Sequence, residues 1–441
     1  MTATPWAILL CNFSDAGSEP YTRSRFEEIF TPVGAGKFNM IDYFRDMSHG
    51  SLDLNGSKVF PPNEGWYTIP HERSDYNGFD TVIGGNVVGR SALQIWAREA
   101  AAAAGDDLSA YFNIVVLTNP SVDLFGGTGG VASGDGRNLV NGMTGLSPSY
   151  LGQEMGHGYG LDHARIEGSA QDYMDPFDVM STAAAQMAPH PVYTETDAQG
   201  RPVFLIGPGL TAATMSAMSW LDNTRVWSSG SDRQSTVELR PLHRTDLPGF
   251  LCAKVGNLFV EFRMNEGWDA GLADPVVLIH DYFNGNSYLH PADSGQQGLL
   301  AGDVYSEGDV SNRPARLHGA GARITVAAID AAARTARLTV EKWADQRVMA
   351  GPGSIFGGVA NDGGGWVVVN GKVTIVPPRS PLLRVLEHVS QAQASEAVSH
   401  GVARNLIQQQ VYTAIAEVAT AEAARASSVH VPTMDVLPGR Q

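Results

Sequence analysis

The sequence predicts an α+β protein with a layered N-terminal domain, and two observations support this class. The first is a strand–helix–strand order near the start of the chain, where apolar runs at 6–13 and 112–119 enclose a helical pattern at 89–104. Such an order favours helices packed on a sheet. The second is a change after about residue 233 to short apolar or alternating segments separated by turn residues, which predicts a β-sandwich. The 441 residues exceed one ordinary core, so two or three domains are expected.

The other N-terminal segments are less regular. Residues 37–56 predict a helix followed by a hairpin-like element, and Gly105 is expected to end the helix at 89–104. The Gly-rich segment 123–145 lacks the Gly-Lys-Ser/Thr ending of a phosphate loop. We interpret it as a loop with a short edge strand. A sharper interpretation makes GVAS, at 130–133, the edge strand with which a peptide substrate pairs.

Two further helices are predicted before the β-rich region. The first begins after Ser147, whose hydroxyl is expected to cap it, with Pro148 at the first helical position. Gly158 and Gly160 are expected to end this helix, since glycine readily leaves the helical conformation. The second helix is predicted over 207–223.

The domain boundaries follow from the changes in composition. Residues 1–232 form the first predicted domain and 233–348 the β-sandwich, in which Glu261 and Arg263 alternate and are expected to pair across a sheet. Residues 349–441 contain a Gly-rich linker, a hairpin and a helical tail. The β-sandwich is expected to contain strands at 235–242, 257–264, 275–283, 322–330 and 336–343. In the C-terminal region, the hairpin is expected to turn at Asn370-Gly371 and the helices to span 381–426. The apolar face of the tail predicts packing onto the protein or self-association.

Charge and composition exclude some partners. The formal net charge is −16 with dispersed acidic residues, which argues against nucleic acid or an anionic membrane. No run reaches the roughly 18 apolar residues of a membrane span, and the start of the chain lacks the pattern of a signal peptide, so the location is undecided. Cys11 and Cys252 lie far apart and are expected to be buried thiols, with a long-range disulfide as the alternative.

The stretch QEMGHGYGLDH has the spacing of a metal site. Gln153 and His157 are four residues apart, so both project from one face of a helix, with Glu154 beside them. Gly160 allows a sharp turn that brings His163 back toward this face. Hydrolytic zinc sites have three protein ligands and one position open to water. Glu154 would then be the general base that takes a proton from the metal-activated water.

A second motif follows seventeen residues after His163, where Met180 stands inside YMDPFDVMS. Together with SYLGQEMGHGYGLDHA, GPGLTAATMSAMSWLD, FVEFRMNEGWDAGL and VVLIHDYF, it resembles the gametolysin-like and immune-inhibitor-A-like metzincin metallopeptidases over roughly residues 1–290. The resemblance implies a metzincin-like catalytic domain, secretion, His157 and His163 as ligands, Glu154 as general base and Met180 as the Met-turn residue beneath the metal.

The third ligand position falls on Gln153, where most such proteins have histidine. Glutamine offers a neutral amide oxygen, a harder and weaker zinc ligand than imidazole. It could be a native ligand, as in algal gametolysin-like members, an engineered replacement, or the mark of an inactive relative. The expected cofactor is zinc or another divalent metal such as copper. Tyr193, thirteen residues after Met180, is a possible extra ligand, near His190.

These residues predict a metal-dependent endopeptidase that acts on protein or peptide substrates. The alternative is a catalytically weak or inactive metzincin-like protein that binds proteins or glycans. A third class, a structural assembly protein, would depend on the predicted helices at 381–426.

Overall fold

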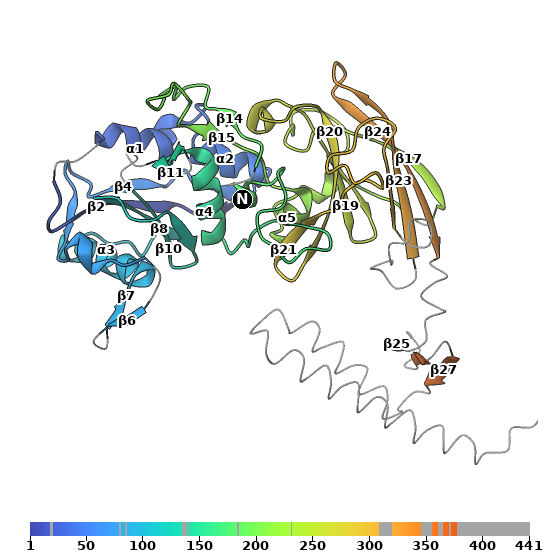
Figure 1. Ribbon diagram of the computed structural model, residues 1–441, viewed down its shortest axis with the longest axis horizontal. Helices are drawn as coiled ribbons and strands as arrows, with labels where there is room; N and C mark the ends of the chain where they lie inside the picture. The colour runs from blue at the N-terminus through green and yellow to red at the C-terminus, as the bar shows by residue number, and fades with distance from the viewer. Residues whose placement is uncertain are drawn as a thin grey trace, which may run out of the picture. The chain divides into compact units, whose positions relative to one another are not determined.

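The computed structural model is mixed α+β, mostly sheet with few helices, which confirms the fold class at this level (Figure 1). It describes residues 1–17, 21–78, 81–83, 86–134, 139–140, 142–182, 185–230, 232–307, 320–344, 355–359, 365–369 and 372–376. The chain divides into two compact units, residues 1–344 and 345–441. Among the described residues, no helix is long and apolar enough to cross a membrane.

The first sheet is built around the two predicted strands. β2 (Trp6–Phe13) and β8 (Asn113–Asn119) pair in parallel, with Trp6 opposite Asn113. The strand order is β4-β2-β8-β10-β9, and β5 also pairs with β2. The remaining strands of this sheet are β4 (Lys58–Phe60), β5 (Tyr67–Ile69), β9 (Phe125–Gly127) and β10 (Gly130–Gly134).

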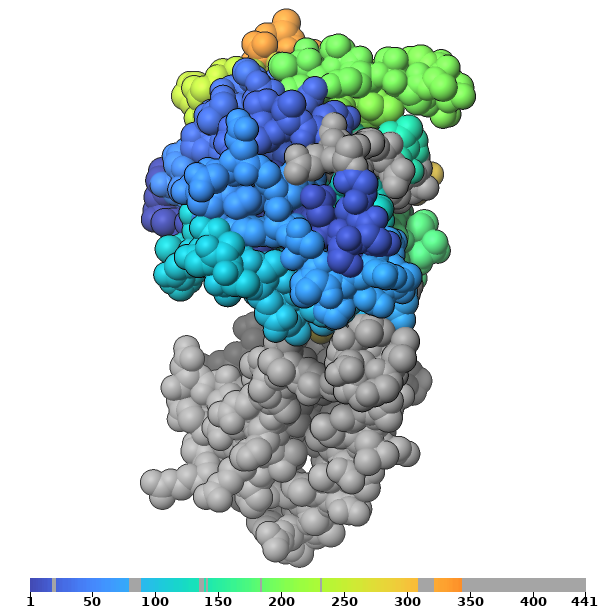
Figure 2. Space-filling model, turned by 90° about the vertical axis from the view of Figure 1, so that its left-hand side faces the viewer, coloured from blue at the N-terminus to red at the C-terminus, as the bar shows by residue number. Residues whose placement is uncertain are grey.

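Alternate side chains of this sheet enter two apolar clusters, because successive strand residues point to opposite faces. Ile8 and Val115 pack on the side of α1, α2 and α4, whereas Leu9 and Val116 pack on the side of α3. These helices are α1 (Arg23–Phe30), α2 (Met40–Met47), α3 (Arg90–Ala103) and α4 (Pro148–Gly158). The sheet therefore lies between helices, as Figure 1 shows, and Figure 2 views this part of unit 1 from the side built mainly by its first hundred residues.

Two N-terminal expectations are wrong. GVAS is not an edge strand, because β10 pairs in parallel with β8 and antiparallel with β9. Among the described strands of this sheet, β9 lies at that edge instead. The segment after α2 is not a hairpin: β3 (Leu52–Asp53) pairs in parallel with β1 (Thr2–Ala3), and β4 joins β2. The partners β1 and β2 are distant in sequence from β3 and β4, and the parallel partner β8 is separated from β10 by β9, so local pattern does not reveal these pairings.

The predicted helix over 207–223 is shorter than expected. α5 spans only Ala212–Ala217, because Thr211 caps its N-terminus by accepting a hydrogen bond from the Thr214 N–H and Ser219, at φ +60°, turns the chain just after the C-cap residue Met218. Pairing joins other short strands: β6 (Thr81–Ile83) to β7 (Asn86–Val88), β11 (Leu139–Val140) to β12 (Met143–Thr144), and β14 (Ala188–Pro189) to β15 (Leu205–Ile206).

The C-terminal part of unit 1 contains two sheets with one shared apolar cluster. Their orders are β13-β21-β20-β19-β18-β16 and β17-β24-β23-β22. The strands are β13 (Arg165–Ile166), β16 (Val226–Ser228), β17 (Gln234–Leu239), β18 (Cys252–Val255), β19 (Leu258–Arg263), β20 (Val276–Phe283), β21 (Asn286–Leu289), β22 (Val304–Glu307), β23 (Ala320–Asp330) and β24 (Thr335–Ala344). Because β13 and β16 precede residue 233, chain from the first predicted domain also enters the first of these sheets. The boundary at 232/233 stays a prediction.

In the second unit, β25 (Ile355–Val359), β26 (Gly365–Val369) and β27 (Lys372–Val376) form an antiparallel sheet. Val369 pairs with Lys372, which confirms the predicted hairpin, although its turn at 370–371 lies outside the described residues. The predicted helices at 381–426 and their self-association face also lie outside them. Cys11 and Cys252 are both buried and free, so the disulfide alternative is not realised.

Candidate metal site

Helix α4 carries three of the predicted site residues, and it begins where the sequence predicts. Pro148 occupies the first turn and Ser147 is the N-cap residue. The Ser147 hydroxyl does not cap the helix, however. It donates to the Leu205 carbonyl at 2.6 Å and accepts from the Leu205 N–H at 2.8 Å. The expected cap is therefore wrong, and this side chain instead ties α4 to β15.

The end of α4 places the second half of the motif. The helix ends at Gly158, and Gly160 has φ +92°, a left-handed conformation that glycine adopts without steric cost. The Gly160 N–H donates to the His157 carbonyl at 2.9 Å, and the Leu161 N–H donates to the Gly156 carbonyl at 3.0 Å. These two bonds are the Schellman pattern that closes many helices. They confirm the predicted stop and turn the chain back along the helix.

The turn brings the two predicted histidine ligands together. The ring centroids of His157 and His163 lie 4.7 Å apart, with the rings nearly perpendicular. His157 Nδ1 lies 2.8 Å from the Leu161 carbonyl oxygen, and His163 Nδ1 lies 3.1 Å from Asp172 Oδ2. Because these oxygens only accept, each Nδ1 donates, and the lone pair of a neutral ring is then on Nε2. Metal-binding histidines have this outer arrangement. Burial lowers the pKa of His157, which favours its neutral form.

Gln153 and Glu154 are both buried on the same helix. The Gln153 amide oxygen accepts a hydrogen bond from the Thr182 N–H at 2.9 Å, and its nitrogen donates to Glu154 Oε1 at 3.3 Å. Burial raises the pKa of Glu154 to about 7, with Arg90 opposing the rise. A carboxyl group with this pKa is suited to exchange protons near neutral pH. Gln153 thus connects the predicted general base with the segment that follows Met180.

Met180 lies under α4, as the resemblance implies. It is 1% exposed, and its sulfur occupies space beside Gly156, where an added Cβ would lie 2.8 Å from Sδ. Its N–H donates to Asp178 Oδ1 at 2.8 Å, and the Ser181 hydroxyl donates to the Ala164 carbonyl at 3.2 Å. Glycine at position 156 therefore permits the close approach. Spacing alone does not single out Gly156, although a glycine inside a helix is a signal of close packing.

Two buried aspartates hold the Met180 segment against the start of α5 and against β20. Asp178 Oδ2 accepts from the Thr211 N–H at 3.4 Å, and Asp175 Oδ2 lies 2.9 Å from His280 Nε2 on β20. All of Asp175, Asp178 and His280 are fully buried. His280 therefore has a structural partner, and the segment under α4 is fixed to the second half of unit 1.

Tyr193 belongs to the same apolar cluster as Met180, and its ring and polar contacts are with His190, Arg25 and Glu28. Its ring stacks on His190 at 4.4 Å between centroids, and the Arg25 guanidinium lies 4.7 Å from its ring centroid. Its hydroxyl lies 3.5 Å from Glu28 Oε2. Another tyrosine, Tyr173, lies beside His163, and sequence spacing did not single it out.

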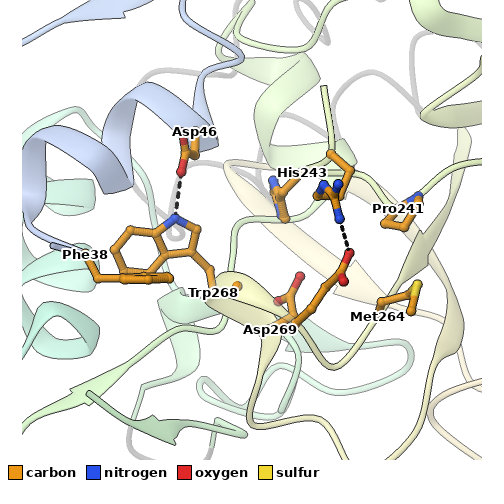
Figure 3. Close-up of a pocket in the computed structure, with 10 residues that line it drawn as sticks. Phe38, Asp46, Pro241, His243, Met264, Trp268 and Asp269 are labelled. Atoms are coloured by element: carbon orange, nitrogen blue, oxygen red, sulfur yellow. Dashed lines mark hydrogen bonds and ion pairs between the residues drawn. The ribbon is translucent and has the colours of Figure 1, made fainter. Parts of the chain in front are cut away.

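A cavity of about 270 Å³ lies elsewhere in unit 1. Its lining residues are Phe38, Asp46, Pro241, His243, Arg244, Met264, Glu266, Gly267, Trp268 and Asp269. Trp268 Nε1 donates to Asp46 Oδ2 at 3.0 Å (Figure 3). Arg244 Nη1 donates to Glu266 Oε1 at 2.6 Å. No residue of the predicted metal site lines this cavity, so it is a separate feature.

No protein-family model matches the chain, and no match was found among curated proteins. A functional proposal therefore depends on the chemistry of the site residues. Among the described residues, no three His, Cys, Asp or Glu side chains converge to hold a metal ion.

Proposed function

We propose that the protein is a metal-dependent endopeptidase with a metzincin-like catalytic domain followed by a β-sandwich. The observation that carries the proposal is the pair of imidazoles, His157 and His163, with centroids 4.7 Å apart and Nδ1 of each engaged by an oxygen. This arrangement places the lone pair of each neutral ring on Nε2, the nitrogen that would bind a metal. Met180 packing beneath the same helix is consistent with the resemblance.

The residues present suit zinc or copper, since imidazole binds both well. Such a metal, when bound, supplies Lewis acidity to polarise a peptide carbonyl and activate water. Glu154 takes the proton of that water and later gives it to the leaving amine. Gln153, the third ligand that the sequence predicts, donates from its amide nitrogen to Glu154 Oε1 and so orients that carboxylate.

Strand β9 provides a place for a peptide substrate. Gly126 packs so closely on α4 that an added Cβ would lie 2.1 Å from the Glu154 carbonyl oxygen. A peptide that adds a strand to an exposed sheet edge gains main-chain hydrogen bonds without a sequence requirement. We infer that the scissile peptide pairs with β9 and so passes beside Glu154. β9 thereby takes the role that the sequence predicted for the strand at 130–133.

Metal analysis combined with a protease assay tests this proposal. We expect about one equivalent of bound zinc or copper per chain, and cleavage of an unfolded protein substrate that stops on chelation and returns when metal is restored. Stoichiometric metal without cleavage would favour the alternative, a metzincin-like binding protein. Absence of both metal binding and chelator-sensitive cleavage would contradict the proposal.

Replacing Gln153 by histidine tests the third position. Imidazole is a better zinc ligand than an amide oxygen, so if position 153 faces the metal, Gln153→His should tighten zinc binding by roughly tenfold or more. Competition with a chromophoric chelator measures the affinity. Gln153→Asn is the matched control, because it keeps an amide but shortens the reach. Equal affinities of the His variant and the parent protein would mean that position 153 does not face the metal.

A further inference from the structure

Tyr173 contacts one of the two proposed metal ligands directly. Its hydroxyl lies 2.8 Å from His163 Nε2, and its ring centroid lies 4.2 Å from that of His163. Its neighbour Asp172 binds the other ring nitrogen, Nδ1, at 3.1 Å. Adjacent residues of one segment therefore engage both nitrogens of this imidazole. Since Nδ1 donates to the carboxylate, the phenol hydroxyl donates to the Nε2 lone pair.

The segment that carries Tyr173 is held in place. Asp172 Oδ1 accepts from Arg165 Nε at 2.8 Å, and Arg165 Nη1 lies 3.3 Å from the Tyr288 hydroxyl on β21. Tyr173 itself has φ +64°, a conformation that is uncommon outside glycine. The side chain is 36% exposed, so solvent and ions reach it. The hydroxyl is thus directed at Nε2 from a fixed backbone at the surface of the site.

The Gln153 oxygen is less accessible than the Tyr173 hydroxyl. It already accepts from the Thr182 N–H at 2.9 Å, and Gln153 is 7% exposed. Turning this oxygen fully toward a metal would leave the buried Thr182 N–H without its acceptor, which costs about 1–3 kcal/mol. Metal binding by the Tyr173 oxygen costs no such bond to the backbone, because the metal takes the place of the hydrogen bond between Tyr173 and His163 Nε2.

We propose that the Tyr173 oxygen, with His157 Nε2 and His163 Nε2, is the third protein ligand of the metal, and that Gln153 is a positioning residue. The inference depends on the proposed metal site. A divalent ion takes the place of the proton shared by the Tyr173 oxygen and His163 Nε2, and that proton leaves to solvent. The product is a phenolate–metal bond, and no oxidation or reduction occurs. The proposed ligand set is two neutral nitrogens and one oxygen anion, whereas a site with three histidine ligands has three neutral nitrogens.

Metal titration of variants tests the assignment. Tyr173→Phe keeps the aromatic ring beside His163 and removes only the oxygen. We expect it to weaken Zn²⁺ binding by at least about tenfold, measured by isothermal titration calorimetry. With Cu²⁺, the parent protein should show a visible phenolate-to-copper charge-transfer band, and Tyr173→Phe should lack it. The band reports the bond itself, independently of any peptidase activity.

Two other variants are the controls. Tyr193→Phe removes the alternative tyrosine, and Gln153→Ala removes the alternative amide ligand. Both should retain the copper band. Tyr173→His supplies a different ligand at the same position, so it should recover much of the Zn²⁺ affinity without the band.

The outcomes separate this assignment from the proposed function. If the parent protein binds Zn²⁺ and Tyr173→Phe binds it equally well, the tyrosine assignment is overturned while the metal site stands. If the copper band is absent from the parent protein, or is lost in Tyr193→Phe instead, Tyr173 is again not the ligand. If neither metal binds the parent protein, both proposals fail.

Discussion

Replacing Arg263 by leucine is expected to lower the free energy of unfolding by about 3–5 kcal/mol. Arg263 is 1% exposed, and it contacts Glu261 Oε1 at 2.8 Å and Asp269 Oδ1 at 2.7 Å. Leucine would leave two buried carboxylates without their cation. Arg263 also donates to the Leu210 carbonyl, so the loss extends to the segment that enters α5.

Urea unfolding followed by circular dichroism measures this effect. Arg201→Leu is the matched control, because the Arg201 side chain is 69% exposed and its loss is expected to change stability little. Arg263→Lys retains the charge but not the forked geometry, so its stability should lie between those of the parent protein and Arg263→Leu. If Arg263→Leu and Arg201→Leu lower the free energy of unfolding by the same amount, the buried ion pairs of Arg263 stabilise the fold no more than an exposed pair does.

The Arg263 network also shows what sequence can predict. The alternation of Glu261 and Arg263 on β19 indicated a pair, and the pair exists, but along one strand and not across the sheet. Asp269 was not predicted as a partner, since it comes from a separate 3₁₀ turn at Gly267–Asp269. Local periodicity specifies which side chains share a face. It does not specify which loop will cover that face.

At the candidate metal site, too, local contacts could be predicted from the sequence and long-range contacts could not. The four-residue spacing and the glycine turn were sufficient to place His157 near His163, because helix geometry and its C-terminal closure are local. The bond between Gln153 and Thr182 joins residues 29 apart, and the contact of Tyr173 with His163 depends on how the intervening loop packs. Neither contact has a spacing signal. The short strand β10 was misplaced because it inserts between β9, its neighbour in sequence, and the earlier strand β8, so the order in the sheet differs from the order along the chain.

Replacing Glu154 by glutamine is expected to lower the rate of the proposed peptide hydrolysis by about 10²–10⁴-fold, the range typical of losing a general base. Metal affinity should change little, because the amide keeps the shape of the carboxylate and the acceptor for the Gln153 nitrogen. The rate constants of both proteins at equal metal loading provide the measurement. Similar rates would remove Glu154 from the mechanism even if the protein cleaves peptides.

Stability provides a second test of Glu154 that needs no substrate. Burial raises the pKa of Glu154 in the folded protein to about 7, above its unfolded value, so the folded state binds this proton more tightly. As pH rises from the ordinary carboxyl pKa of 4.5 toward and through about 7, the buried carboxyl must ionise, and the stability of the folded state falls. In chelator-treated protein, Glu154→Gln should therefore match the parent protein near pH 4 and exceed its stability by roughly 2–3 kcal/mol near pH 9. If the difference between the two proteins does not change with pH, Glu154 is not the desolvated acid that the proposed reaction requires.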